Sequence, residues 1–95
     1  MPRLIYSRRA LEDIARLREF LLPKDPVAAA NAANAIRKTI ALLKVQPLIG
    51  KPKDEGYREI ESKFGKTGYM ILYRLHNQTI VITAIKHQKE ADYMR

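Results

Sequence analysis

The chain has 95 residues, of which 46% are hydrophobic, enough for one modest core and too few for two, so we expect one domain over residues 1–95. It contains no cysteine, which excludes a disulfide framework, a thiol nucleophile and a thiolate metal site. Eighteen Lys and Arg residues against ten Asp and Glu residues give a net charge of +8, which points to nucleic acid, an anionic membrane surface or an acidic protein segment as partner.

The N-terminal segment predicts an edge strand followed by a helix. Arg3–Tyr6 is a short run of β-prone residues, and Ser7 is a suitable N-cap. From Arg8 to Pro23, apolar residues recur at helical spacing and predict an amphipathic helix. Its inner stripe is Ala10, Ile14, Leu17 and Leu21, and we expect Glu12, Asp13, Arg16 and Glu19 on its other faces.

A second helix is predicted to begin at Asp25 and Pro26 and to run to about Val45. The Asp25 carboxylate can cap free backbone N–H groups, and proline at the first helical position loses no hydrogen bond. Its inner stripe is Ala29, Ala32, Ala33, Ile36, Ile40 and Leu43. The short connection to the first helix predicts an antiparallel helical hairpin.

The second half of the chain predicts strands. Segment 46–56 is rich in proline and glycine and marks the change from helical to extended structure. We predict strands at Tyr57–Phe64, Tyr69–Leu75 and Thr79–Lys86, the last two joined by His76–Gln78, and then a tail, His87–Arg95. The predicted fold class is therefore α+β: an N-terminal strand, a helical hairpin and a three-stranded antiparallel meander, with the helices packed on one face of an antiparallel sheet.

No targeting or cofactor signal is found in the sequence. The N-terminal residues lead into a mixed-charge stretch, so we expect no secretory signal, and the apolar runs are far shorter than the ~20 residues of a membrane-spanning helix. We therefore expect a cytoplasmic protein without membrane contact. Two isolated histidines do not supply a zinc site, and no Gly-rich phosphate loop is present, so we expect neither metal nor cofactor.

Basic residues of the second half are candidates for binding phosphate or a target. Lys51 and Lys53 lie in the breaker-rich loop, where a solvated surface is an equal alternative. Sheet neighbours could bring Arg58, Arg74 and Lys86 together into a concave basic surface that holds phosphate or carboxylate. The alternative for Arg74 is an ion pair with Glu59 or Glu61 across the sheet.

His87 and Tyr93 are the remaining candidates for chemistry. A lone histidine is more often structural or solvated than catalytic. Tyr93 follows His87 by six residues. The two side chains could form an acid/base pair, or Tyr93 could anchor the tail by packing.

Six segments together resemble the RelE/ParE superfamily of type II toxin-antitoxin toxins, in an order that covers almost the whole chain. They are residues 10–14 (ALEDI), 25–29 (DPVAA), 47–52 (PLIGKP), 57–60 (YREI), 68–74 (GYMILYR) and 85–93 (IKHQKEADY). The resemblance implies a bacterial toxin in a hetero-oligomer with a cognate antitoxin, whose acidic, partly disordered C-terminal segment silences it. An acidic partner that folds on binding would account for the charge of +8. The expected antitoxin-binding residues lie on the helices: Leu11, Ile14, Leu17, Ile36 and Ile40.

Two branches of this superfamily imply different targets. In the RelE-like branch, which cleaves mRNA in the ribosome, Lys86 and Tyr93 match catalytic positions and Arg58 lies near another. However, His87 stands where that branch has an arginine, and Glu59 and Glu61 would repel an RNA backbone. The ParE-like branch inhibits DNA gyrase by binding, and the Arg58-Glu59-Ile60 pattern looks more like this branch, which we therefore favour. A plain nucleic-acid-binding module ranks below both because no aromatic platform or recognition helix is evident.

Overall fold

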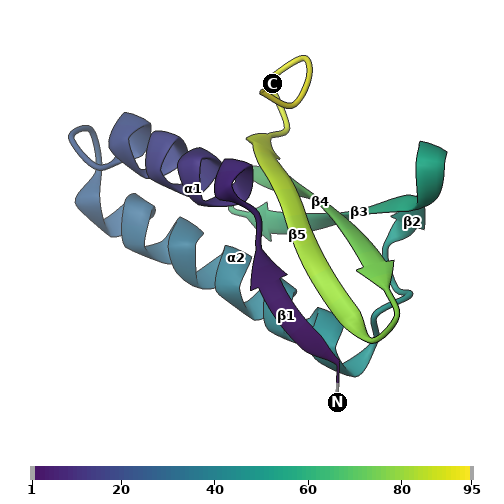
Figure 1. Cartoon of the computed structure of the whole chain (residues 1–95). Helices are drawn as coiled ribbons and strands as arrows, with labels where there is room; N and C mark the ends of the chain where they lie inside the picture. The colour runs from purple at the N-terminus through teal and green to yellow at the C-terminus, as the bar shows by residue number, and fades with distance from the viewer. Residues whose placement is uncertain (1, 95) are drawn as a thin grey trace.

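The computed structural model describes residues 2–94 and contains two helices, a short 3₁₀ turn and a five-stranded sheet (Figure 1). The elements in chain order are β1 (Arg3–Tyr6), α1 (Arg8–Leu21), α2 (Pro26–Val45), β2 (Lys51–Pro52), η1 (Asp54–Gly56), β3 (Tyr57–Phe64), β4 (Thr67–His76) and β5 (Thr79–His87). The predicted α+β class and element order are confirmed. The loop between the second helix and the meander adds a two-residue strand and a 3₁₀ turn that were not predicted.

The sheet is mixed rather than purely antiparallel. Its strand order is β1-β5-β4-β3-β2, and β1 pairs with β5 in parallel while the other neighbours pair antiparallel. The expectation of an antiparallel sheet therefore holds for the meander and is wrong for β1. The helical hairpin returns the chain to the end of the sheet where β1 begins, so that β3 and β5 run in the same direction as β1 (Figure 1).

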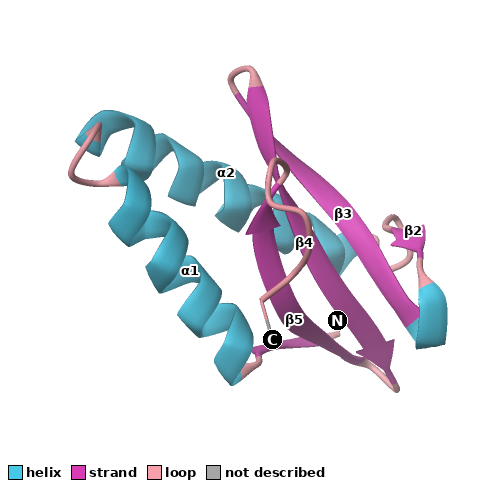
Figure 2. Cartoon of the chain, turned by 90° about the horizontal axis from the view of Figure 1, so that it is seen from above, coloured by secondary structure: helices cyan, strands magenta, loops and turns pink. Residues whose placement is uncertain are grey.

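Both helices begin where the sequence predicts, because each has a side-chain cap. The Ser7 hydroxyl accepts the Ala10 N–H at 3.0 Å, and the Asp25 carboxylate accepts the Ala28 N–H at 3.0 Å. Such caps satisfy backbone donors that have no partner inside the helix. The hairpin lies across one face of the sheet. The other face, which the helices leave open and which is called the open face below, is crossed by the segment after β5 (Figure 2).

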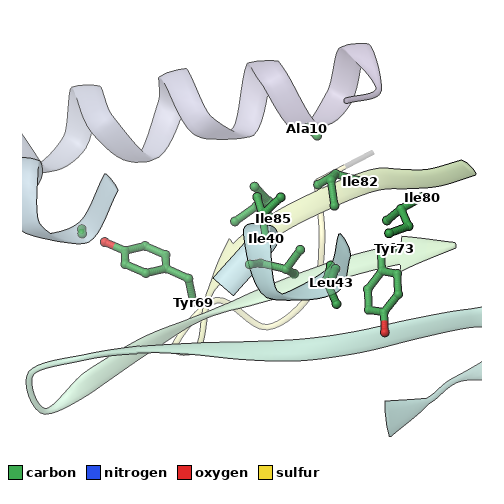
Figure 3. Packing of buried hydrophobic residues seen from close by; sticks show 10 residues of the cluster. Ala10, Ile40, Leu43, Tyr69, Tyr73, Ile80, Ile82 and Ile85 are labelled. Atoms are coloured by element: carbon green, nitrogen blue, oxygen red, sulfur yellow. The ribbon is translucent and has the colours of Figure 1, made fainter. Parts of the chain in front are cut away.

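The core lies between the helical hairpin and the covered sheet face (Figure 3). Its buried residues are Ala10, Ala32, Ile40, Leu43, Tyr69, Ile71, Tyr73, Ile80, Ile82 and Ile85. Ile14, Leu17, Leu21 and Ile36 are partly buried and pack against this cluster, as their helical spacing predicts. Among residues 2–94, no helix is long and apolar enough to cross a membrane.

One polar residue of α1 is buried, contrary to expectation. Asp13 was placed on an outer face of the helix, but it is only 2% exposed. Its carboxylate accepts the backbone N–H of Ile85 in β5 at 2.9 Å. Because Asp13 follows Ala10 by three residues and precedes Leu17 by four, helical spacing brings it onto the inner stripe.

Candidate functional site

The open face of the sheet carries a hollow of about 1050 Å³. Strands β3, β4 and β5 form its floor, and the segment after β5 and the region around η1 flank it. Its lining residues are Arg9, Lys53, Asp54, Glu55, Tyr57, Glu59, Met70, Leu72, Thr83, Ala84, Lys86, Gln88, Ala91, Asp92, Tyr93 and Met94. Three of these side chains are basic and four are acidic, so the hollow does not carry the positive charge that dominates the chain.

Strand periodicity explains the floor of the hollow. Successive side chains of a strand point to opposite sheet faces. In β4, Ile71 and Tyr73 enter the core, so Met70 and Leu72 face the open side. Leu72 is paired with Glu59 of β3 on one side and with Ala84 of β5 on the other, and this row crosses the middle of the floor.

Glu59 and Tyr93 form the central polar contact of the hollow. The Tyr93 hydroxyl donates to the Glu59 carboxylate at 2.5 Å, and Lys53 lies 3.7 Å from the other carboxylate oxygen. Burial raises the pKa of the Tyr93 phenol well above its usual value, and the hydrogen bond to Glu59 raises it further. Tyr93 is therefore a protonated donor at neutral pH, and Glu59 is its acceptor.

Lys86 lies next to this pair. Its ammonium donates to the backbone carbonyl of Glu90 at 3.0 Å and lies 5.5 Å from the centre of the Tyr93 ring. The structure thus brings together two of the predicted catalytic residues, Lys86 and Tyr93, on the open face.

His87, the third predicted catalytic residue, lies on the opposite face. Its ring meets the Tyr69 ring edge-on at 5.3 Å between centroids, Nδ1 accepts the Lys89 N–H at 3.1 Å, and Nε2 lies 2.6 Å from the Thr67 hydroxyl. The acid/base pair of His87 with Tyr93 is therefore not formed. Because both ring nitrogens have hydrogen-bond partners, we infer a structural role for His87 at the end of β5.

A β-bulge decides which of Lys86 and His87 faces the hollow. Leu72 pairs with Ala84 and Tyr73 pairs with Ile82, so Thr83 of β5 has no partner in β4. An extra residue of this kind reverses the alternation of the bulged strand. Ile82 faces the core before the bulge and Ile85 faces it afterwards, which directs Lys86 to the open side.

Arg58 also lies on the helix-covered side and does not join the predicted basic surface. It pairs with Tyr73, whose side chain is in the core. Its guanidinium donates to the carbonyls of Leu48, at 3.2 Å, and Gly50, at 2.8 Å. Arg58 therefore holds the loop before β2 in place, and the predicted cluster of three basic residues is wrong at this position.

Arg74 neither joins a basic surface with Arg58 and Lys86 nor forms the ion pair that was the alternative. It pairs with Tyr57 across the sheet, its guanidinium lies 4.1 Å from the centre of the Tyr57 ring, and it donates to the backbone carbonyl of Glu55. It therefore forms no ion pair with Glu59 or Glu61. The cation–π contact with Tyr57 and the hydrogen bond to Glu55 of η1 indicate that Arg74 stabilises the rim of the hollow.

The two loop lysines have different surroundings. Lys53 lines the hollow and pairs with Glu59, as described above. Lys51 is exposed and is the register partner of Glu59 in β2. Residues directly opposite in an antiparallel pair share a sheet face, so both lysines lie on the open side.

The residues expected to bind an antitoxin differ in how far their side chains are exposed. Leu11 is 55% exposed, whereas Ile40 is 3% exposed. Ile14, Leu17 and Ile36 line a small cleft of about 50 Å³ between the helices. Ile40 is thus a core residue whose side chain offers no contact surface, and the prediction for it is corrected.

Sequence reasoning missed the cluster at the root of the C-terminal segment. One carboxylate oxygen of Glu90 accepts from Arg16 at 2.7 Å, and the other accepts the backbone N–H of His87 at 2.8 Å. Arg16 also contacts Asp13 at 3.3 Å and the carbonyl of Ile85 at 3.4 Å. The signal available in the sequence was the position of Asp13 on an apolar helical stripe, which indicates a buried partner.

The described residues show no grouping of three or more His, Cys, Asp or Glu side chains that could hold a metal ion. At the centre of the hollow, the Tyr93 phenol donates to the Glu59 carboxylate, and the Lys86 ammonium lies beside the Tyr93 ring. Such a set can bind donor and acceptor groups of a partner.

Comparison with known proteins identifies relatives over nearly the whole chain. Residues 4–92 match the family described as ParE toxin of type II toxin-antitoxin system, parDE. The chain is 34% identical to Toxin RelE3 of Caulobacter vibrioides over 82 residues. These aligned residues cover 86% of this chain and 89% of that protein. The chain is 33% identical over 87 residues to Toxin RelE1 of the same organism, which covers 92% and 94%.

Two solved structures share the fold. The chromosomal ParDE toxin-antitoxin system from P. aeruginosa matches with a TM-score of 0.76 at 20% identity, over 92% of this chain and 96% of that one. The intact E. coli RelBE toxin-antitoxin complex matches with a TM-score of 0.66 at 16% identity, over 95% and 100%. At these identities the likeness concerns the arrangement of helices and strands.

Proposed function

This chain belongs to the ParE toxin family of type II toxin-antitoxin systems, and from this membership we propose that it inhibits DNA gyrase by binding and is neutralised by a cognate antitoxin. It is a toxin of the ParE/RelE kind, with relatives that carry both names.

The observation that carries the gyrase proposal is the division of the candidate catalytic residues between two sheet faces. Lys86 and Tyr93 face the hollow, whereas Arg58 and His87 face the helix side and hold the loop and the end of β5. Cleavage of RNA needs a base for the ribose hydroxyl and cations for the phosphate within one site. That set is not assembled on either face, and a surface that binds a protein needs no such set.

The charge of the hollow supports the same choice. Its acidic side chains, Asp54, Glu55, Glu59 and Asp92, outnumber its basic ones, Arg9, Lys53 and Lys86. A polyanionic RNA backbone would be repelled by such a lining, whereas a protein segment with donors and apolar groups would match it.

A RelE-like ribosome-dependent mRNA endoribonuclease is the second candidate function. The observation that favours it is the contact of Lys86 with Tyr93, because these residues match catalytic positions of that branch and lie together. In that case Lys86 would stabilise phosphate charge and Tyr93 would transfer a proton. The strongly raised pKa of Tyr93 opposes a role as base at neutral pH.

The proposed antitoxin follows from the charge of the chain and from its neighbours. The structures that this fold resembles are toxin-antitoxin systems. A net charge of +8 favours rapid association with an acidic segment, and such a segment can fold on binding. Leu11 and the cleft lined by Ile14, Leu17 and Ile36 are the proposed apolar contacts in this hetero-oligomer.

The first testable prediction separates the two branches. Purified toxin, added in excess to DNA gyrase without ribosomes, should inhibit supercoiling of relaxed plasmid or trap cleaved DNA, and prior addition of the antitoxin should prevent this effect. In parallel, ribosomes translating a defined message should leave that message intact in the presence of the toxin.

Normal supercoiling at toxin excess, together with cuts in the translated message, would contradict the gyrase proposal and establish the second candidate. The matched variants are Lys86→Gln and Lys63→Gln, each of which removes one lysine charge. Lys86 lines the hollow, whereas Lys63 lies on β3 outside it and serves as the control. In the nuclease case only Lys86→Gln should abolish cleavage.

A further inference from the structure

The segment after β5, residues 88–94, turns back across the open face of the sheet. In Figure 2 it passes in front of β4 and β5, and Tyr93 reaches Glu59 on β3, which is the next strand beyond β4. Five of its residues line the hollow, namely Gln88 and the four from Ala91 to Met94. The chain therefore covers part of its own candidate binding surface.

The root of this segment is held by several contacts. The Glu90 side chain is bonded to Arg16 and to the His87 backbone, and the Glu90 carbonyl accepts from Lys86. Arg16 is itself tied to Asp13, which is buried. These contacts connect the root to α1 and β5, so position 90 is fixed to the body of the protein.

The tip of the segment is held by one strong polar contact. The Tyr93 hydroxyl donates to Glu59 at 2.5 Å, a short charge-assisted hydrogen bond. The Glu59 side chain, which also lies near Lys53, is only 14% exposed. Between root and tip, Ala91 and Asp92 are exposed, and Met94 beyond the tip is 45% exposed.

A segment with this pattern can open without disturbing the core. None of residues 91–94 belongs to the buried core cluster, so opening the tip breaks the bond to Glu59 and exposes the partly buried Tyr93 ring, while the core stays closed. A hydrogen bond to a charged group shifts an equilibrium by about tenfold to a hundredfold. The closed arrangement is therefore favoured, and the open one is accessible.

We propose that residues 91–94 form a strap that swings about Glu90, covering Glu59 when closed and opening to admit a protein segment of the target. This inference rests on the proposed function, in which the hollow contacts gyrase. When the strap opens, Glu59 loses its internal donor and becomes available to a donor side chain of the partner. An arginine, lysine or hydroxyl group would replace the Tyr93 phenol there.

The second testable prediction measures the strap in the isolated protein. Glu59 should couple slowly to glycine ethyl ester in the presence of a water-soluble carbodiimide, while the exposed Glu61 of the same strand couples fast and serves as internal reference. Tyr93→Phe keeps the ring and removes only the donor, so it should raise the Glu59 rate, relative to Glu61, by about tenfold or more. Mass spectrometry of proteolytic peptides gives both rates.

Tyr57→Phe is the matched control, because it removes a phenol hydroxyl from the same hollow without touching the Tyr93 contact. It should leave the Glu59 rate unchanged. An unchanged Glu59 rate in Tyr93→Phe would overturn the strap, as would an equal increase in both variants.

The gyrase assay then tests whether the strap controls access. Tyr93→Phe should inhibit supercoiling with a faster onset than the wild type, whereas for an mRNA nuclease the same change should slow cleavage. Faster coupling of Glu59 without faster onset would overturn the role in access. If the wild-type toxin leaves gyrase untouched, the proposed function fails, while the Glu59 rates still decide whether the strap exists.

Discussion

At the residue scale, Tyr73 shows how one side chain connects the core to the loop before β2. Its ring is fully buried, and its hydroxyl accepts the Gly50 N–H at 2.9 Å and donates to the Pro47 carbonyl at 2.8 Å. A Cβ atom at Gly50 would lie 2.4 Å from this hydroxyl, so only glycine allows such an approach. Together with Arg58, Tyr73 fixes the backbone that leads to Lys51 and Lys53.

The third testable prediction concerns Tyr73→Phe and its pH dependence. At pH 7 the change should lower the free energy of unfolding by about 1–3 kcal/mol, because it leaves the Gly50 N–H and the Pro47 carbonyl without their partner. Urea unfolding of variant and wild type provides the measurement.

The same comparison at about pH 11 should show a smaller difference. Burial raises the pKa of Tyr73 above its usual 10.0, so the unfolded tyrosine loses its proton at a pH where the folded one keeps it. This contribution to wild-type stability is complete below pH 10 and is lost as the pH rises further. Because phenylalanine does not titrate, a difference that stayed constant would contradict the assignment.

At the element scale, side chains form hydrogen bonds with the backbone of β5 beyond the point where its partner strand β1 ends. β1 pairs with β5 only as far as Ile82. Beyond that point the Thr83 carbonyl accepts from Ser7 at 2.7 Å, and the following backbone groups of β5 are bonded by Asp13, Arg16 and Glu90. These polar contacts satisfy an edge that would otherwise be open to another strand, and they attach α1 to the sheet.

The fourth testable prediction compares the two helix caps. Ser7→Ala removes both the cap of α1 and the hydrogen bond to Thr83, so we expect a loss of about 2–3 kcal/mol in the free energy of unfolding. Asp25→Ala removes only the exposed cap of α2 and should cost about 1 kcal/mol. Chemical denaturation of both variants tests this order, and an equal loss would show that the Thr83 contact contributes nothing.

At the scale of the whole molecule, the excess of positive charge lies outside the hollow. The net charge is +8, yet the lining of the hollow contains more acidic than basic side chains. The basic excess therefore lies on other surfaces, which include exposed Lys38 and Lys44 of α2. The proposed acidic antitoxin segment should first meet these surfaces, whereas the proposed target, which enters the hollow, should meet a different electrostatic potential.

The fifth testable prediction follows from this separation. The association rate of toxin and antitoxin should fall by about tenfold between low and half-molar salt, because screening weakens long-range attraction. The double variant Lys38→Gln/Lys44→Gln should lower the low-salt rate more than Lys86→Gln, whose charge lies in the hollow. Stopped-flow measurements check both effects, and a rate independent of salt would remove the electrostatic account of the partner.

Local pattern was enough to predict most of the elements. Helical spacing, the Ser7 and Asp25 caps and the alternation in β4 depend on residues close in the chain, and the predicted bounds of α2 and β3 agree with the structure. The resemblance of ordered segments was also visible in the sequence, and the family match confirms it.

Tertiary structure alone decided which side chains share a face. The bulge at Thr83 arises from pairing between β4 and β5 and places Lys86 in the hollow and His87 beneath it, although the two are neighbours in the chain. The same holds for β1, whose direction relative to β5 depends on how the hairpin returns the chain. Register, strand direction and the position of the strap are set by contacts between residues distant in sequence, which a local pattern does not contain.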